Sequence, residues 1–182
     1  MDARFTKDGS QFTLTLERRL AHPPEKVWRA LTERDLLKQW FPCDVEGEWS
    51  VGAPLRFHFL HGEGEGLSDD EMRGEVLKAE PVRLLEFRWG QHRIRCELAA
   101  AGDGCNLLFS ETIDDASMGA RDAAGWELCL ENLDTLLQGG AIAKFAWDVW
   151  NPKFQRYVQK FEPEFGAQQG PPDNHAAARA EP

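Results

Sequence analysis

The sequence predicts an α+β domain in which one long helix covers an antiparallel sheet. From Gly119 to Gly140, apolar residues recur at intervals of three and four, which is the pattern of one helix face. The segments before this stretch alternate apolar and polar residues, as half-buried strands do. Short turn sequences join those segments, so neighbouring strands are expected to run antiparallel.

The long helix is predicted to run from about Ala120 to Gln138. At 1.5 Å per residue it would be roughly 28 Å long, enough to cross a whole sheet. Gly139 and Gly140 end it, because glycine reaches the left-handed conformation that a helix C-terminus needs. The apolar positions on its predicted buried face are Ala123, Trp126, Leu130, Leu133 and Leu137.

The first part of the chain is predicted to be a strand followed by two short helices. Residues 1–9 are polar and expected to be loose, and residues 11–20 alternate as a strand. Pro24 suits the first turn of a helix, where its missing N–H is no loss. Thr32 can cap a second short helix, which Pro42 ends.

Six further strands are predicted between the short helices and the long helix. They cover about residues 43–52, 54–61, 72–80, 83–90, 92–100 and 105–113. The outer face of the resulting sheet is polar, so one side is expected to face water. The inner side must be covered, and the 119–140 helix is the element long enough to do so.

The chain is expected to have three parts. Residues 1–140 form the domain, residues 141–166 an aromatic-rich helical extension, and residues 167–182 a disordered tail. Asn151 and Pro152 are expected to start the helix of the extension. Its large rings would be costly to leave in water, so the extension should pack on its own domain or on a second copy.

Composition limits the partners and the location. The net charge of −10 argues against nucleic acid and anionic membranes as partners. The four cysteines are scattered without a Cys-x-x-Cys pair, which favours reduced thiols. With no signal peptide and no apolar run long enough to span a bilayer, a cytoplasmic monomer or homodimer is expected.

Three segments resemble, in order, the activator of heat-shock-protein-90 ATPase homologue 1-like family of the START-like (SRPBCC) superfamily. ERRLAHPPEKVWRALTERDLLKQWF resembles its opening, GEVLKAEPVRLLEFRWG its middle signature and AAGWELCLENLDTLL its closing helix. The resemblance covers residues 11–139. It implies the helix-grip fold: a curved antiparallel sheet of six to seven strands, two short helices and a long C-terminal helix over a cavity.

The last strand departs from the family pattern. Many members end this strand with T-H-x-G-F, whereas residues 110–114 here read SETID. Glu111 therefore stands where a histidine is usual, and a role carried by that histidine does not transfer to this chain.

The implied cavity would be lined from the sheet and the long helix. An aromatic lining of this kind suits a small hydrophobic or aromatic ligand, but inward aromatic rings also form filled cores. Both interpretations stay open at the level of sequence. The predicted ligand-binding residues are Trp40, Phe57, Phe59, His61, Trp89, Phe109, Glu111, Trp126 and Leu130.

Two polar residues among them are of special interest. Glu111 is predicted to point inward beside Phe109, where burial would raise the pKa of its carboxyl group. The slightly favoured alternative is that it lies at the strand end and reaches water. His61 has the same geometry at the end of its strand, and a rim position is the more common role of such a histidine.

No metal or cofactor site is predicted. The acidic loop over residues 63–71 lacks calcium-loop spacing, and zinc spacing, a nucleophile elbow, a phosphate loop and a dinucleotide fingerprint are all missing. The sequence therefore favours binding of a small hydrophobic ligand without catalysis. Two alternatives stay open. The resemblance suggests a co-chaperone-like module in stress response that acts on a heat-shock ATPase, and some START-like relatives are cyclase- or hydrolase-like enzymes, for which Glu111 and His61 would be the acid–base candidates.

Overall fold

The computed structural model describes residues 2–60, 68–142 and 146–170. The strands are β1 (Arg4–Asp8), β2 (Gln11–Leu20), β3 (Cys43–Glu46), β4 (Pro54–Phe59), β5 (Arg73–Glu80), β6 (Leu84–Trp89), β7 (His92–Ala101) and β8 (Gly104–Ile113). The helices are α1 (Pro24–Thr32), α2 (Arg34–Trp40), a 3-10 turn (Ala116–Met118), α3 (Gly119–Leu137) and α4 (Trp147–Phe165).

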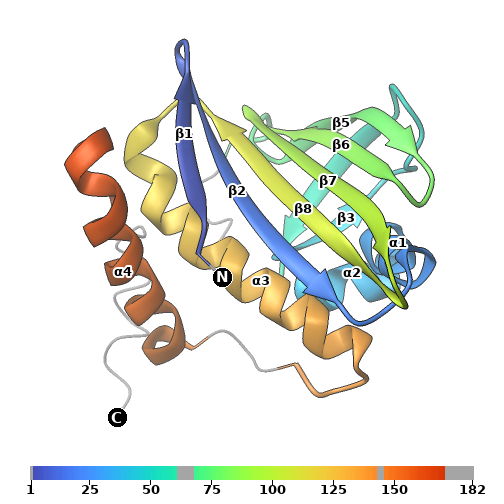
Figure 1. Cartoon of the computed structure of the whole chain (residues 1–182). Helices are drawn as coiled ribbons and strands as arrows, with labels where there is room; N and C mark the ends of the chain where they lie inside the picture. The colour runs from blue at the N-terminus through green and yellow to red at the C-terminus, as the bar shows by residue number, and fades with distance from the viewer. Residues whose placement is uncertain (1, 61–67, 143–145, 171–182) are drawn as a thin grey trace.

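These elements form the predicted helix-grip fold. In the described residues, eight strands make one antiparallel sheet in the order β1-β2-β8-β7-β6-β5-β4-β3. The two short helices are inserted between β2 and β3, and α3 crosses one face of the sheet (Figure 1). The helix-grip prediction is confirmed, with one strand more than the seven expected.

The additional strand lies at the N-terminus, in the segment expected to be loose. β1 pairs antiparallel with β2, from Arg4 opposite Thr15 to Asp8 opposite Gln11. Its buried side chain is Phe5, whose ring lies 5.1 Å from the Phe161 ring of α4. The apolar contact that stabilises this strand therefore comes from the other end of the chain, and a local polar pattern cannot reveal it.

The strand predicted over residues 43–52 is shorter in the structure. β3 ends at Glu46 because Gly47 adopts a φ of +136°, and a Cβ there would lie 2.5 Å from the Pro54 carbonyl oxygen. The chain turns at this point. Trp49 leaves the strand pattern and packs on Phe87, with ring centroids 5.3 Å apart.

The long helix buries the face that its sequence predicts. All five predicted apolar positions on α3 are buried, and they join the sheet and the short helices in one core. Trp40 of α2 is also buried, and its Nε1 donates to the Ala30 carbonyl of α1 at 2.9 Å. This hydrogen bond joins the two short helices to each other.

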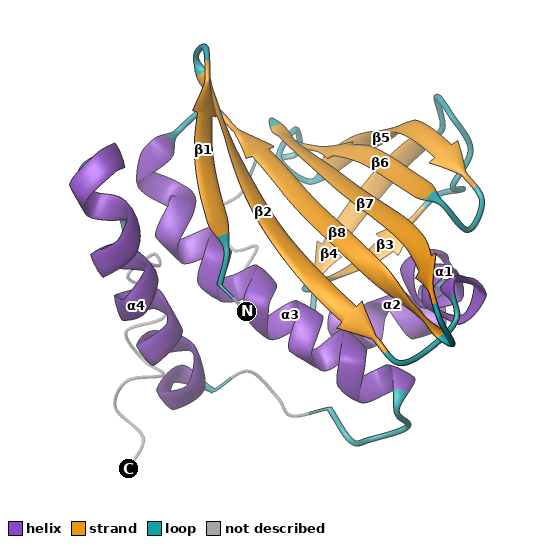
Figure 2. Cartoon of the chain, in the orientation of Figure 1, coloured by secondary structure: helices purple, strands orange, loops and turns teal. Residues whose placement is uncertain are grey.

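The C-terminal extension packs on its own domain. α4 lies alongside α3 (Figure 2) and buries Trp150, Phe154, Tyr157 and Phe161. The prediction that this helix starts at Asn151 is wrong, because α4 begins at Trp147 and continues through Pro152. The proline removes one backbone hydrogen bond, a loss that burial of the large Trp150 ring offsets.

Part of the predicted tail is also ordered. Gln168 accepts a hydrogen bond from the Ala120 amide at 2.9 Å, and the Gln169 amide donates to the Ser117 carbonyl at 2.8 Å. Residues 167–170 therefore return to the start of α3, and the prediction of disorder is wrong for them. Residues 171–182 lie outside the described residues. In the described parts of the chain, no helix has both the length and the apolarity needed to cross a membrane.

A buried carboxylate joins α3 to α4. Glu127 is 5% exposed. Lys153 donates to its Oε1 at 2.8 Å, while Arg156 and the Tyr157 hydroxyl donate to Oε2. Burial by itself would raise the pKa of Glu127, but these donors outweigh it and lower the pKa to about 2. The ionised carboxylate is therefore part of the contact between the two helices.

We expect the protein to lose stability in acid as Glu127 is protonated. Its folded pKa lies below the unfolded value of about 4.3, so its stabilisation is complete above that value and is lost as the pH falls towards about 2. Urea unfolding of the wild type and Glu127→Gln across this range measures the effect. The variant should be less stable at neutral pH, and the difference should shrink in acid.

Glu131→Gln is the matched control for this experiment. Glu131 also accepts from Lys153, at 2.7 Å, but its side chain is 46% exposed. An exposed pair contributes little, so this variant should change stability by less than about 1 kcal/mol. A pH-independent difference between the wild type and Glu127→Gln would contradict the assignment.

Candidate functional site

Aromatic side chains fill the space between the sheet and α3. The rings of Phe57 and Trp89 stack with centroids 4.8 Å apart. Trp126 of α3 lies 4.6 Å from Phe109 and 5.5 Å from Phe41, and it meets Trp89 edge-on at 6.4 Å. The predicted aromatic residues are thus brought together in one layer.

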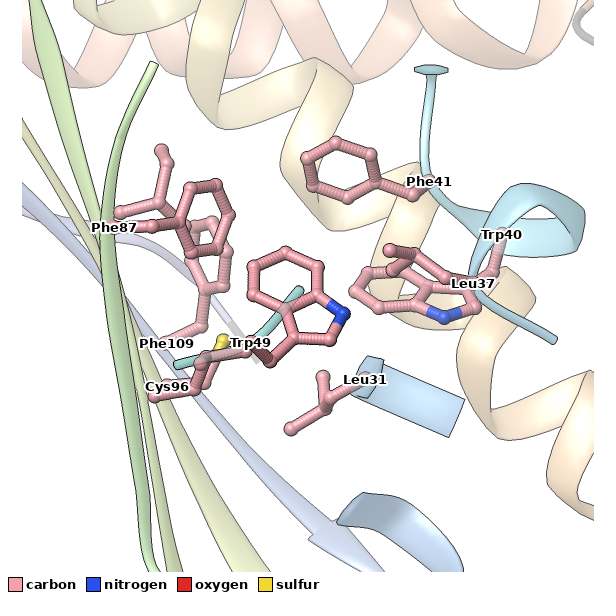
Figure 3. Close-up of a pocket in the computed structure, with 10 residues that line it drawn as sticks. Leu31, Leu37, Trp40, Phe41, Trp49, Phe87, Cys96 and Phe109 are labelled. Atoms are coloured by element: carbon pink, nitrogen blue, oxygen red, sulfur yellow. The ribbon is translucent and has the colours of Figure 1, made fainter. Parts of the chain in front are cut away.

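The remaining free space in this layer is small. A cavity of about 10 Å³ lies between the short helices and the sheet (Figure 3). It is lined by Leu31, Leu37, Trp40, Phe41, Trp49, Leu85, Phe87, Ile94, Cys96 and Phe109. This volume holds one water molecule at most. In this conformation the space is a packed core, and a ligand of several rings could enter only if side chains moved.

The predicted ligand-binding residues differ in burial. Phe59 and Trp89 are half-buried at the edge of the aromatic layer, with ring centroids 5.6 Å apart. His61 lies outside the described residues. The remaining predicted apolar residues are fully buried: Trp40, Phe57, Phe109, Trp126 and Leu130.

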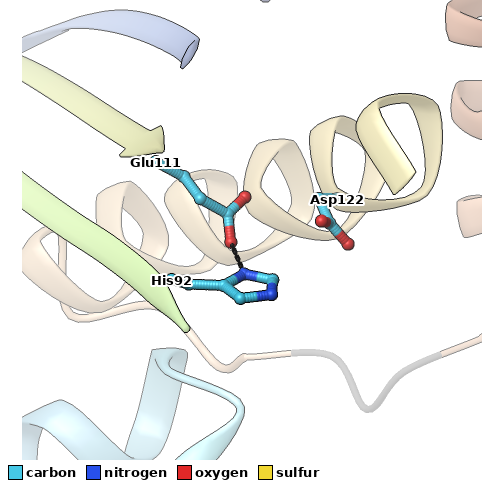
Figure 4. Close-up of side chains that lie close together, drawn as sticks. All are labelled: His92, Glu111 and Asp122. Atoms are coloured by element: carbon cyan, nitrogen blue, oxygen red, sulfur yellow. Dashed lines mark hydrogen bonds and ion pairs between the residues drawn. The ribbon is translucent and has the colours of Figure 1, made fainter. Parts of the chain in front are cut away.

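Glu111 points inward. It is 2% exposed, so the alternative in which it reaches water is wrong. Its Oε1 lies 2.7 Å from Nδ1 of His92 at the start of β7, and its Oε2 accepts a hydrogen bond from Nε1 of Trp126 at 2.8 Å (Figure 4). The ends of two adjacent strands and one face of α3 therefore meet at a buried carboxylate.

Asp122 in the first turn of α3 completes a polar cluster with His92 and Glu111. Each residue offers one ligand atom, and these atoms lie within 4.8 Å of one another. The Asp122 side chain is 10% exposed, and its Oδ1 accepts from Nε of Arg121 at 2.9 Å. Its Oδ2 is buried and has no hydrogen-bond partner in the described part of the chain.

The electrostatics of the cluster follow from burial and the two acids. Burial and the nearby charge of Glu111 raise the pKa of Asp122. Burial lowers the pKa of His92, but its hydrogen bond and attraction to Glu111 outweigh this and raise it. The His92 side chain is 35% exposed, so the cluster reaches the surface through this ring.

His92 and Asp122 are the site residues that the sequence analysis does not identify. A signal existed for His92, because the apolar residues Ile94, Cys96 and Leu98 are buried along β7 and residue 92 shares their alternation. Asp122 precedes Trp126 by one helical turn, which places both on one face of α3. Their meeting with Glu111 depends on how α3 lies on the sheet, and local patterns do not determine this.

The cluster has several chemical capacities. A carboxylate against Nδ1 of His92 fixes the ring orientation and favours the Nδ1–H tautomer. Nε2 can then accept a proton or bind a ligand hydroxyl. The unpartnered Oδ2 of Asp122 can accept a hydrogen bond or bind a cation.

A sheet wrapped against one long helix, with a polar cluster at the edge of an aromatic interior, defines a START-like helix-grip domain, a fold of ligand-binding domains in general. The sequence profile of the family described as "Activator of Hsp90 ATPase homolog 1-like protein" matches residues 21–138, which is more than half of the chain. The chain belongs to this family.

Several solved structures have a similar fold. A conserved protein of unknown function, EF2215 from Enterococcus faecalis, is 24% identical with a TM-score of 0.67, covering 86% of this chain and 91% of that chain. CalU16 from Micromonospora echinospora is 20% identical with a TM-score of 0.67, covering 87% and 93%. The protein encoded by gene BPP1335 from Bordetella parapertussis is 26% identical with a TM-score of 0.65, covering 85% and 87%. No curated protein matches the sequence.

Substitution of Trp126 separates packing from hydrogen bonding at the site. Trp126→Ala should destabilise the protein by about 3–5 kcal/mol, because it empties a core position and leaves Oε2 of Glu111 without its donor. Trp126→Phe keeps most of the ring packing and should cost only about 1–3 kcal/mol. Chemical denaturation measures both values, and a loss below about 1 kcal/mol for Trp126→Ala would show that the residue is not part of the core.

Proposed function

We propose that this domain binds a small hydrophobic or aromatic ligand between the sheet and α3, without catalysis. The observation that carries the proposal is the polar cluster of His92, Glu111 and Asp122 beside the aromatic layer. Burying carboxylates is costly, and packing alone does not require them there. Such a combination of apolar walls and a few convergent polar groups is typical of ligand sites.

The aromatic layer provides a route to the cluster. Phe59 and Trp89 are half-buried at its edge, and Trp89 contacts Trp126, which donates to Glu111. A flat ligand that displaced the outer rings would meet Trp126 and then the polar cluster. The unpartnered Oδ2 of Asp122 would accept a hydrogen bond from a hydroxyl group of the ligand.

The small cavity bears on the expected affinity. With about 10 Å³ of free space, binding requires a more open conformation, and its population reduces the apparent affinity. Phe59 and Trp89 lose less packing on moving than the fully buried rings, so they are the side chains we expect to shift. The resulting affinity should be weak to moderate.

Tryptophan fluorescence tests the proposal. We expect a hydroxylated flavonoid-like compound to quench the fluorescence saturably, and an analogue without the hydroxyl group to bind more weakly. Asp122→Asn should weaken binding of the hydroxylated compound by about tenfold, equivalent to about 1.4 kcal/mol. It should also reduce the difference in affinity between the two compounds. Glu131→Gln, an exposed change on the same helix, should leave both affinities unchanged. The absence of saturable quenching across a broad aromatic library would contradict the proposal.

An acid–base enzyme of the cyclase or hydrolase kind is the second candidate. The contact of 2.7 Å between His92 and Glu111 favours it, because Glu111 would orient the ring and Nε2 would transfer the proton. In the described residues the histidine beside Glu111 is His92, and His61 lies outside them. Chromatography of the compounds after the titration separates the two functions: unchanged compound supports binding, and conversion that His92→Gln abolishes supports the enzyme.

We also propose, from the family description, that this chain acts on a heat-shock ATPase. It would use a protein-interaction surface rather than the polar cluster. Capture of such an ATPase by the purified protein, followed by measurement of its ATP hydrolysis, tests this function independently of ligand binding.

A further inference from the structure

The polar cluster has the donor set of a metal site. One imidazole and two carboxylates are ligands that divalent transition metals such as Zn²⁺ accept, and three protein ligands with an open fourth position are common in such sites. The three ligand atoms lie within 4.8 Å of one another. Ligands about 2.1 Å from one ion are separated by roughly 3.4 Å in a tetrahedral site. Ligand atoms farther apart than this would have to approach one another, and the Glu111–His92 pair would have to open.

We propose that His92, Glu111 and Asp122 bind one divalent transition-metal ion of the zinc class. The independent observation behind this proposal is Oδ2 of Asp122, a buried oxygen without a hydrogen-bond partner in the described residues. A buried carboxylate oxygen of this kind is costly unless something binds it. A cation between the three side chains supplies the missing partner.

The surroundings of the two carboxylates support this assignment. Trp126 holds Oε2 of Glu111 at 2.8 Å, and Arg121 holds Oδ1 of Asp122 at 2.9 Å. Each carboxylate therefore has one oxygen held by a donor outside the cluster, while Oε1 of Glu111 contacts His92 and Oδ2 of Asp122 has no partner in the described residues. Outer donors orient the ligands in this way in established metal sites.

Metal binding would change one contact in the cluster. Oε1 of Glu111 and Nδ1 of His92 are 2.7 Å apart and hydrogen-bonded. The proton between them would be released when an ion takes its place, and the two atoms would separate by about 0.7 Å to reach the tetrahedral spacing. The half-exposed ring of His92 leaves the fourth position of the ion on the side that reaches the surface.

The ligands come from three elements, which is why the sequence shows no metal motif. His92 begins β7, Glu111 is near the end of β8, and Asp122 lies in the first turn of α3. Each is held by regular structure, so the positions of the ligands are well defined. The proposal does not depend on a hydrophobic ligand, because the ion would need only these side chains and water.

The test uses the full chain after dialysis against a chelator. Isothermal titration with ZnCl₂ should give one equivalent per chain, and Co²⁺ should give visible absorption bands of a nitrogen- and oxygen-ligated site. His92→Gln and Asp122→Asn should each weaken binding at least about tenfold. His58→Gln is the matched control, because His58 lies 3.3 Å from Glu46 in an exposed pair on β3 and β4, and it should leave binding unchanged.

Circular dichroism and the unfolding midpoint of each metal-free variant establish that it is folded. If His92→Gln fails to fold, Asp122→Asn still tests whether the cluster binds the ion, because asparagine has nearly the same shape as aspartate. The proposal is overturned if the wild type binds no ion, if Asp122→Asn binds as tightly as the wild type, or if His58→Gln weakens binding equally. The fluorescence titration repeated in chelator distinguishes failure of the metal site from failure of the hydrophobic-ligand proposal.

Discussion

The position of α3 on the sheet depends most directly on Trp126. Its ring contacts Phe109 of β8 and Phe41 after α2, so one side chain joins the sheet, the short helices and the long helix. The same indole donates to Glu111, which connects this packing to the polar cluster. Any movement of α3 along the sheet would therefore cost apolar contact and leave a buried carboxylate without its donor.

Another face of α3, about 100° around the helix, meets α4 through a different interaction. Glu127, next to Trp126 in sequence, faces α4 and receives its three donors from that helix. Tyr157 also accepts a hydrogen bond from the Ala3 amide, which brings the start of the chain into the same contact. Because α3 is covered on two sides, its position is fixed both by aromatic packing and by buried ion pairs.

Much of the fold follows from side-chain periodicity, because each strand and α3 bury one regular face. Periodicity does not predict β1, because Phe5 is buried by Phe161 and Phe165, which are distant in sequence. It also misses the first turn of α4, because the Asn151-Pro152 signal for a helix start lies after the actual first residue, Trp147. For the site, alternation along β8 predicts the inward position of Glu111 and, along β7, is also sufficient for His92. Asp122 is different: its place beside Glu111 depends on the packing of Trp126, which no local pattern expresses.

The balance of donors and acceptors explains why the cluster is suited to bind something. Glu111 receives Trp126 and His92 on its two oxygens, so its charge is compensated within the fold. Asp122 receives Arg121 on one oxygen and gains from the positive end of the α3 dipole, but its Oδ2 is left over. A donor group of a ligand or a metal ion would compensate that oxygen, and both would approach beside the half-exposed His92. Under either proposal, the unpartnered oxygen of Asp122 would couple folding to binding at this end of α3.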